Sequence, residues 1–322
     1  MISVSEITDA WKNIQVSDKN QKFYKLVYIN SKTKIRASIK RDENLKAIEF
    51  IFPKSFFSKQ NFSFKETKGL KVTIESEAGY ENELIICIYL KTENFLDIYL
   101  NLIEKIINHI FDSSDFEKNI QIIFDKLISW RRCFENDDQF ILSFPEQLGL
   151  FGELTYIEKL FINKVSAEEI LTSWKGPDGG LHDFLLQNNI YEVKTFLNKN
   201  KKIRISNIEQ LNYKIYKNLS LICVELEESN VGLNVSNLAQ KIKAEIFSKK
   251  YNANKFEDKL SSYGYFEYQS NKYTRSFLAK NIFEYFVTQD FPTILPVNLL
   301  AGIEDVSFNL DIKFIENYIK KI

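Results

Sequence analysis

The chain has 322 residues, enough for about two domains with a sizeable buried core. Hydrophobic residues make up 44% of the sequence and charged residues 27%, a composition typical of soluble globular proteins that excludes a disordered chain. The 43 basic residues equal the 43 acidic ones, so no protein-wide positive field is available to attract nucleic acid, although a local basic strip can still bind it.

Cysteine and histidine are too few and too scattered to build the common metal and redox sites. The three cysteines, Cys87, Cys133 and Cys223, have no Cys-x-x-Cys spacing, so we expect no disulfide framework or zinc knuckle and infer a reducing, cytoplasmic setting. The two histidines supply neither haem ligation nor most catalytic triads. No secretion signal or membrane span is expected, because every apolar run is short. Any chemistry must therefore depend on carboxylates and lysines.

Residues 1–140 are expected to form a β-rich N-terminal domain with two helices, preceded by a short first helix. Alternating apolar residues predict strands near residues 23–29, 34–40, 47–52, 70–75 and 84–90. Apolar residues at three- and four-residue steps predict helices near residues 95–111 and 115–131. The polar run 136–139 is the best linker candidate. Target recognition, partner binding and dimer contacts all remain open as roles for this domain.

Residues 141–322 are expected to form a second domain. It begins with a helix that carries Pro145 in its first turn and continues to about Phe161. Next we expect a short strand at 170–174, the breaker run 176–180, and two strands at 181–186 and 190–196 that form a hairpin. The later expected elements are a helix at 206–217, a strand at 219–226, a helix at 236–247, a strand at 276–287 and a helix at 314–321.

The length of the hairpin loop decides which charged residues meet. A two-residue turn centred on Gln187 and Asn188 sets Asp183 opposite Glu192, and a turn one residue later sets it opposite Lys194. Glu192 and Lys194 share one face of their strand, so Asp183 joins them in either register. A three-residue loop would set Asp183 opposite Val193 instead and break the cluster.

Three charged side chains on one face of a largely apolar hairpin need a compensating interaction. Two neighbouring carboxylates repel each other, and a divalent cation is the simplest relief. Oxygen ligands suit Mg²⁺ or Mn²⁺ better than zinc. A lysine beside such an ion can hold an attacking water or stabilise charge that develops on a phosphate. The cluster therefore favours metal-assisted hydrolysis of a phosphodiester.

The hairpin residues Asp183 and Glu192-Val193-Lys194 are accompanied by further short motifs. These are Gly149-Leu-Phe-Gly-Glu-Leu154, Trp174-Lys-Gly-Pro177, His182-Asp-Phe184, Glu192-Val-Lys-Thr195, Ile205-Ser206 with Gln210-Leu211, and Phe291-Pro292 with Gly302-Ile-Glu-Asp-Val306. Together they resemble the PD-(D/E)XK nuclease superfamily, and within it a little-characterised prokaryotic family associated with phage-defence and restriction gene clusters. The resemblance covers roughly residues 145–310, and the first domain resembles no family that we can name.

The resemblance implies a fold and a set of site residues. The fold is α/β, or α+β overall, with a restriction-endonuclease-like core in which helices flank a mixed central sheet. Asp183 and Glu192 would ligate Mg²⁺, with Mn²⁺ able to substitute, and the main-chain carbonyl of Val193 would be a further ligand. Lys194 would be the catalytic lysine. Glu153 matches an acid that reaches the metal directly or through water, so it joins the catalytic and metal-binding set.

Two further positions follow from the resemblance. Ser206 and Gln210 lie one turn apart on the helix predicted after the catalytic strand, where related nucleases place a glutamine near the metal or the phosphate. The literal Pro177-Asp178 pair would lie beyond the end of the catalytic strand, so we prefer Asp183 as the metal-binding aspartate.

Several of these residues also have plainer interpretations. Glu153 interrupts an apolar or small helix face and needs a partner or a metal there, unless it reaches solvent at the helix edge. The segment 194–204 contains no acid, and its basic residues either contact DNA phosphates or form a solvated loop; they are Lys199, Lys201, Lys202 and Arg204. We expect His182 and Trp174 to pack in the core. We interpret another Glu-x-Lys triplet, 257–259, as a solvated face.

These inferences favour a cytoplasmic, Mg²⁺-dependent endonuclease that hydrolyses DNA in a restriction or phage-defence system. Its expected partner is DNA, with no membrane, and a second copy of the chain or other defence proteins are possible partners. The alternative is a catalytically silent DNA-binding or assembly subunit that keeps the nuclease fold, although its intact Asp, Glu and Lys set argues against this. An RNA nuclease and a protein-interaction scaffold also remain open.

Overall fold

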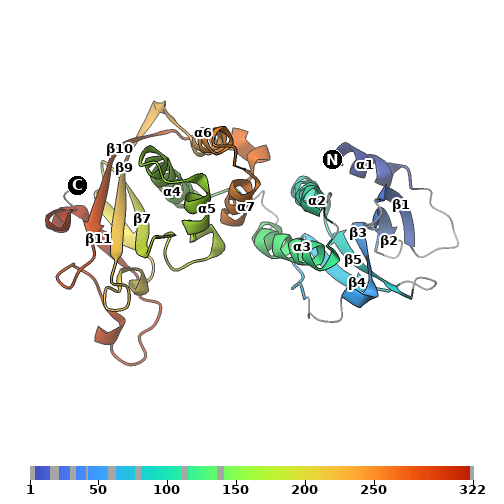
Figure 1. Ribbon diagram of the computed structural model, residues 1–322, viewed down its shortest axis with the longest axis horizontal. Coiled ribbons are helices and arrows are strands. Elements are labelled where there is room, and N and C mark those ends of the chain that lie inside the picture. Colours follow the sequence, from blue (N-terminus) through green and yellow to red (C-terminus); the bar gives the residue numbers. More distant parts are fainter. Residues whose placement is uncertain are drawn as a thin grey trace. The chain divides into compact units, whose positions relative to one another are not determined.

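The computed structural model describes residues 4–14, 22–29, 34–40, 43–56, 63–76, 81–110, 113, 115–135, 141–251 and 253–319. The chain divides into two compact units, Met1–Phe140 and Ile141–Ile322 (Figure 1). The linker predicted at residues 136–139 lies outside the described residues. In the described part of the chain, no helix has both the length and the apolar character that a bilayer crossing requires.

The first unit is an antiparallel five-stranded sheet with helices packed on it (Figure 1). The strand order is β1-β2-β3-β5-β4, and the predicted strands and long helices are all present. The strands are β1 (Lys22–Ile29), β2 (Lys34–Lys40), β3 (Leu45–Pro53), β4 (Leu70–Glu75) and β5 (Glu83–Leu90). The helices are α1 (Val4–Lys12), α2 (Leu96–Ile110) and α3 (Phe116–Trp130).

Both faces of this sheet carry buried polar contacts that fix its packing. The hydroxyl of Tyr99 on α2 accepts a hydrogen bond from the main-chain N–H of Ile48 (2.9 Å) and donates one to the carbonyl of Ile88 (2.6 Å). On the opposite face the fully buried Glu49 accepts hydrogen bonds from Arg36 and from Ser38. A buried carboxylate is tolerated only with such donors, so these contacts specify how the strands pair.

The second unit is built on a mixed four-stranded sheet of order β10-β9-β7-β6. β6 (Phe184–Leu186) is antiparallel to β7 (Asn189–Leu197), which runs parallel to β9 (Leu219–Leu233), and β10 (Phe277–Phe286) is antiparallel to β9. The helices α4 (Phe144–Ile162), α5 (Ala167–Ser173), α6 (Val235–Ser248) and α7 (Asn254–Tyr263) gather beside this sheet (Figure 1). The predicted mixed sheet flanked by helices is present.

The α4 helix begins and packs as its sequence predicts. Ser143 and Glu146 form a capping box, and Pro145 lies in the first turn. At Gly152 the helix crosses β7 so closely that an added methyl group would lie 2.2 Å from Cγ2 of Thr195. Only a glycine permits this approach, which holds the next residue, Glu153, beside the catalytic hairpin.

The hairpin adopts the first of the two predicted registers. Leu186 pairs with Asn189 and Phe184 pairs with Tyr191, so a two-residue turn joins the strands. Both turn residues have positive φ, 49° at Gln187 and 66° at Asn188, as expected for a type I′ turn. The same register, continued by one residue, sets Asp183 opposite Glu192.

Three predicted elements of this unit are wrong. Residues 167–173 form α5 rather than the strand expected at 170–174, because a short apolar run does not distinguish a buried helix from a strand and Ser166 caps a helix here. The helix expected at 206–217 is a single 3-10 turn at Ile208–Leu211. The helix expected at 314–321 consists of short 3-10 turns at Ile312–Phe314 and Glu316–Tyr318, with residues 320–322 outside the described part.

Two further features, α7 and a two-stranded sheet, were not predicted from the sequence. β8 (Lys202–Ile205) pairs only with β11 (Phe308–Asp311), in an antiparallel register that matches Arg204 with Asn309. Each strand has four residues and finds its partner about a hundred positions away, so neither leaves a clear local pattern. Their apolar residues cover the core formed by β7, β9 and β10.

Candidate active site

The residue just before β6, Asp183, places a carboxylate at the edge of β7. The paired part of β6 starts at Phe184, and the N–H of Val193 therefore donates to Oδ2 of Asp183 (2.7 Å) instead of to a strand carbonyl. The main-chain carbonyl of Asp183 accepts from the N–H groups of Lys175 (2.6 Å) and Gly176 (3.2 Å). Burial raises the pKa of the Asp183 carboxyl, and the Lys194 ammonium and the Val193 N–H oppose that rise.

Glu192 and Lys194 form an ion pair on one face of β7. Nζ of Lys194 donates to Oε1 of Glu192 at 2.5 Å. Glu192 is completely buried, and its second oxygen, Oε2, has no hydrogen-bond donor within the described part of the chain. Burial and the neighbouring Asp183 raise the pKa of Glu192 to about 8. An unpartnered buried oxygen of this kind is costly and requires an explanation.

Lys194 stays charged because carboxyls surround it. Burial lowers the pKa of its ammonium, but the charges of Glu192, Asp183 and Glu153 outweigh burial and hold the pKa above its ordinary value. The opposite face of the hairpin is apolar, as expected: Phe184 is fully buried, and Tyr156 of α4 contacts the rings of both Phe184 and Tyr191.

Glu153 reaches the same cluster from α4. Its side chain is buried, so the alternative of a glutamate exposed at the helix edge is wrong. Nε1 of Trp174 donates to its Oε2 at 2.6 Å, and Tyr263 of α7 supplies another hydrogen bond. Burial, followed by the charges of Asp183 and Glu192, raises the pKa of Glu153 well above its ordinary value. Trp174 is fully buried, as predicted, and also serves as a donor to the site.

Gly176 shows how closely the carboxylates meet. A methyl group added at this glycine would lie 2.7 Å from Oε2 of Glu153 and 3.0 Å from Oδ1 of Asp183. Both carboxylates therefore close on the same stretch of main chain, and only the absence of a side chain at this position leaves room for them.

The remaining oxygens fit a hard divalent cation. Asp183 uses Oδ2 and Glu192 uses Oε1 for protein contacts, which leaves Oδ1 of Asp183 and Oε2 of Glu192 available. No three His, Cys, Asp or Glu side chains among the described residues are arranged to hold a metal ion on their own. Mg²⁺ commonly binds through one or two carboxylates and keeps several waters, so the two oxygens suit it. The roles of Glu153 and of the Val193 carbonyl as ligands stay predictions.

One of three comparisons with known proteins identifies the family of the chain. The model of the family described as "Putative PD-(D/E)XK family member, (DUF4420)" matches residues 7–313. The chain belongs to this PD-(D/E)XK family. No curated protein and no solved structure matches the chain. PD-(D/E)XK proteins are generally nucleases that use divalent metal ions, and the α+β, restriction-endonuclease-like fold predicted for the chain is confirmed. The match begins in the first unit, which therefore belongs to the family although its sequence resembled none we could name.

The predicted nucleic-acid contacts lie on the surface of this PD-(D/E)XK protein. The described structure leaves Lys199, Lys201, Lys202 and Arg204 exposed, between the end of β7 and the end of β8. Ser206 and Gln210 do not share an α-helix, because Gln210 lies on the 3-10 turn and Ser206 precedes it, but Oγ of Ser206 donates to Oε1 of Gln210 (3.1 Å). Their contacts with DNA stay predictions.

His182 ties Gln210 to the catalytic hairpin. As expected, its side chain is buried. Nε2 of His182 lies 3.1 Å from the main-chain carbonyl of Gln210, which serves as its hydrogen-bond acceptor. The residue that precedes Asp183 in the chain is thus fixed to the segment that follows β8.

The α7 helix supplies functional side chains that the sequence did not reveal. Lys259, interpreted from the sequence as part of a solvated face, is buried and donates from Nζ to Oδ2 of Asp178 (2.7 Å) and to the carbonyl of Trp174. Asp178 is therefore a structural partner in the loop before β6. No sequence pattern pointed to α7; the structure shows its close approach at Gly149, one helical turn before Glu153, where an added methyl group would lie 2.8 Å from the Tyr263 hydroxyl.

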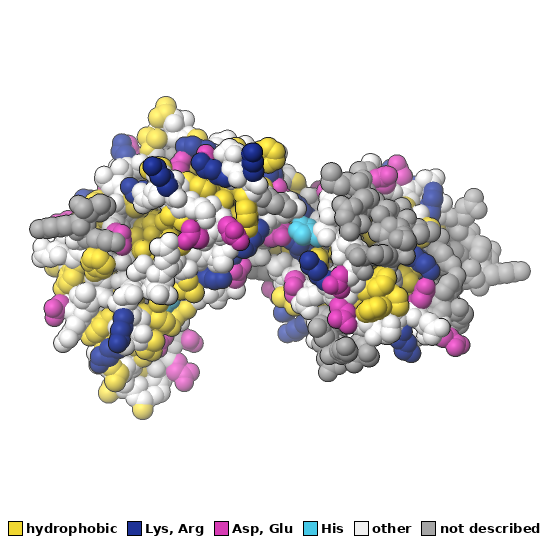
Figure 2. All heavy atoms as spheres, viewed as in Figure 1, with side chains coloured by type: hydrophobic (Ala, Val, Ile, Leu, Met, Phe, Trp, Pro, Cys, Tyr) yellow, Lys and Arg dark blue, Asp and Glu magenta, His cyan; other side chains and the backbone are white. Residues whose placement is uncertain are grey.

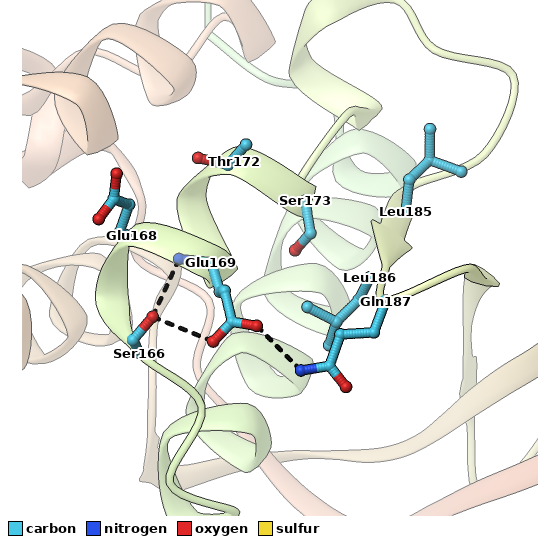
Figure 3. Close-up of a pocket in the computed structure, with 8 residues that line it drawn as sticks. All are labelled: Ser166, Glu168, Glu169, Thr172, Ser173, Leu185, Leu186 and Gln187. Carbon is cyan, nitrogen blue, oxygen red and sulfur yellow. Dashed lines mark hydrogen bonds between the residues drawn. The ribbon is translucent and has the colours of Figure 1, made fainter.

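A shallow pocket lies apart from these residues. It is lined by side chains of α5, its N-cap Ser166 and the hairpin, and the Glu169 carboxylate accepts hydrogen bonds there from the Ser166 hydroxyl and from Gln187 (Figure 3). These two donors lower the pKa of the Glu169 carboxyl, Gln187 contributing more. The contacts tie the hairpin turn to α5, and none of the predicted catalytic residues lines this pocket.

The raised pKa values predict that the metal-free protein loses stability as pH rises. A carboxyl whose pKa is higher in the folded than in the unfolded protein stabilises the fold while it is protonated. For Glu192 this contribution is complete below the unfolded pKa of 4.5, and it is lost as pH rises through the folded pKa of about 8. We expect the melting temperature in EDTA to fall between about pH 5 and about pH 9, and to fall less for Glu192→Gln. Thermal unfolding by circular dichroism measures this, and parallel curves for the two proteins would contradict it.

Loss of the Lys259 ammonium should destabilise the loop that carries Trp174. Because Asp178 is 47% exposed, we expect Lys259→Met to lower the free energy of unfolding by about 2 kcal/mol, less than a fully buried pair would. Lys255→Met, on the same helix but exposed, should change it by less than about 0.5 kcal/mol. Urea titrations compare the variants, and equal effects would show that Lys259 does not fix this loop.

Proposed function

We propose that this protein is an endonuclease that requires a divalent cation and hydrolyses phosphodiester bonds in DNA. The supporting observation is that Glu153 and Glu192 are buried beside the half-buried Asp183 and Lys194, with Oε2 of Glu192 left without a donor among the described residues. A structural ion pair alone gives no reason to place two extra carboxyls beside it. The family membership supplies the matching reaction class.

Asp183 and Glu192 would hold Mg²⁺, with Mn²⁺ able to substitute, through Oδ1 and Oε2, the oxygens not used in their hydrogen bonds with Val193 and Lys194. When bound, such an ion polarises the phosphate and lowers the pKa of a coordinated water. The protein contributes fixed geometry: the Val193 N–H holds the Asp183 carboxylate, and Lys194 holds that of Glu192. Glu153 would serve as the third acid of the site.

Lys194 supplies the positive charge that the reaction needs from the protein. Hydrolysis adds the oxygen of a water to phosphorus and breaks one P–O bond, which leaves a phosphomonoester and a hydroxyl. The Lys194 ammonium either orients that water or offsets the negative charge that grows on the phosphate oxygens. The facing carboxyls keep it protonated for this purpose.

The DNA would lie over the exposed basic residues that follow β7, with phosphates contacted by Lys199, Lys201, Lys202 and Arg204 and with Ser206 and Gln210 nearby. We propose a cytoplasmic restriction or phage-defence setting, with which three free, buried cysteines are compatible. A second copy or other defence proteins are proposed partners. The rival function, a silent DNA-binding subunit, would not need the complete set of Asp183, Glu192 and Lys194.

Cleavage of plasmid DNA tests the proposal. With Mg²⁺ or Mn²⁺, we expect the wild type to cut and Asp183→Asn, Glu192→Gln and Lys194→Ala each to lose at least about 100-fold in rate. Glu66→Gln is a matched control, because Glu66 begins a Glu-x-Lys triplet on the surface of the first unit, and it should keep the wild-type rate. EDTA should abolish cutting.

Two outcomes would contradict this function. Equal rates in the wild type and all three site variants would assign the activity to another source. Binding of DNA without any cleavage in either metal would favour the silent subunit. Single-stranded DNA and RNA are digested in parallel, and cleavage of RNA alone would replace DNA as the substrate.

A further inference from the structure

Residues 212–218, which we name the 212–218 turn, form a compact projection where the sequence predicted a helix. The main-chain carbonyl of Asn212 accepts from the N–H groups of Ile215 (3.2 Å) and Tyr216 (3.1 Å). Asn212 is itself buried, and its side chain donates to Oε2 of Glu209 (2.8 Å). Tyr213 and Tyr216 pack against the core beneath β8 and β9. The base of the turn is therefore firmly held.

The tip of the turn presents one large aliphatic side chain between two lysines. Ile215 is 64% exposed, and Lys214 and Lys217 on either side are also exposed. A single exposed isoleucine is ordinary on a protein surface and carries no meaning by itself. Ile215 gains meaning from the two lysines that flank it and from the contacts that connect its turn to the carboxylates.

Basic side chains outnumber acidic ones in the segment that leads from β7 to the end of this turn. Residues 195–218 hold six basic side chains and one acid, Glu209, and none of the six forms an ion pair within the described part of the chain; they are Lys199, Lys201, Lys202, Arg204, Lys214 and Lys217. Elsewhere in the second unit, carboxylates pair with Lys241, Lys243, Lys249, Lys259, Arg275, Lys280 and Lys313. On the face seen in Figure 2, basic and acidic side chains are correspondingly mixed. An unpaired basic surface of this kind is suited to a polyanion.

The turn is joined directly to the catalytic hairpin. The ring of Tyr216 meets the ring of His182 edge-on, with centroids 4.6 Å apart. His182 also uses the Gln210 carbonyl as a hydrogen-bond acceptor, and it immediately precedes Asp183. Ile215 is therefore held in a fixed position relative to the carboxylates, a short chain of contacts away from them.

We infer that Ile215 is a wedge that enters between adjacent base pairs of duplex DNA beside the phosphate to be cut. The inference rests on the proposed function and adds a deformation of the substrate to it. Lys214 and Lys217 would hold the phosphates on either side of the opened step. Unstacking costs a few kcal/mol per step, and burial of the aliphatic side chain together with the phosphate contacts offsets it. The kink would move one phosphate out of the regular backbone, toward the carboxylates.

Unwinding of a closed plasmid tests the wedge without using cleavage. Plasmid is relaxed by a metal-independent topoisomerase in EDTA while the protein is bound, and the topoisomers are then separated on a gel. We expect the wild type to lower the linking number and Ile215→Ser to lose at least about two thirds of that shift while binding DNA within about threefold of the wild type. Ile162→Ser is the matched control, because Ile162 is a similarly exposed (69%) isoleucine at the end of α4, and it should keep the full shift.

The salt dependence of binding separates the wedge from the cations. Lys214→Ala combined with Lys217→Ala should reduce the slope of log affinity against log salt by about 2, and Ile215→Ser should leave that slope unchanged. A full topoisomer shift with Ile215→Ser, or no shift with the wild type, overturns the wedge. A loss of self-association in Ile215→Ser with an unchanged shift assigns the side chain to a contact between copies and also overturns it.

The two proposals can fail separately. A wild type that cuts DNA in Mg²⁺ but causes no unwinding removes the wedge and leaves the nuclease. A wild type that unwinds DNA through Ile215 but cuts nothing upholds the wedge and removes the proposed nuclease function.

Discussion

A carboxyl buried beside other carboxyls must either keep its proton or acquire positive charge, and the second unit is arranged around that requirement. Glu192 has no exposed surface, and Asp183 and Glu153 lie close to it. Lys194 supplies one positive charge and occupies one oxygen of Glu192. The other oxygen has no donor among the described residues, and with its pKa raised to about 8 Glu192 keeps its proton near neutral pH unless a cation takes the proton's place.

The fold meets this requirement by bringing three elements together at the edge of one strand. The two-residue turn at Gln187 and Asn188 fixes the register that places Asp183. Because the pairing of β6 with β7 begins only at Phe184, the Val193 N–H is free to donate to the Asp183 carboxylate. Close packing at Gly152 brings in α4, and the adjacent Glu153 is held by Trp174 and Tyr263. Asp183 and Glu153 are oriented by neutral donors, which restrain their positions without cancelling their charge, whereas Glu192 is held by the charged Lys194 ammonium.

The cluster of Asp183, Glu192 and Lys194 was accessible from the sequence because it depends on short-range rules. Alternation along a strand puts Glu192 and Lys194 on one face, and a two-residue turn then decides the partner of Asp183. The sequence left two registers open, and the positive φ values at Gln187 and Asn188 select the first. Glu153 was found in a similar way, as a charged residue on an otherwise apolar helix face, and its burial agrees with that argument.

The surroundings of the cluster were not accessible, because they depend on contacts between distant segments. Lys259 and Tyr263 belong to a helix with no evident sequence signal, and they act on residues about a hundred positions earlier in the chain. β8 and β11 pair with each other, so each strand depends on a segment far away in the sequence. The segment after β8 has helical spacing between Ser206 and Gln210, but Asn207 caps a single 3-10 turn there and buried Asn212 closes a different turn. Tertiary contacts outweighed local propensity at these positions.

The claim on which the account depends is that Asp183 and Glu192 share one hard cation. Anomalous diffraction from crystals of the protein soaked in Mn²⁺ tests it most directly. We expect one strong peak in contact with Oδ1 of Asp183 and Oε2 of Glu192, and its loss in Glu192→Gln. A peak bound by other residues, or no peak while both carboxylates keep their positions, would contradict the account.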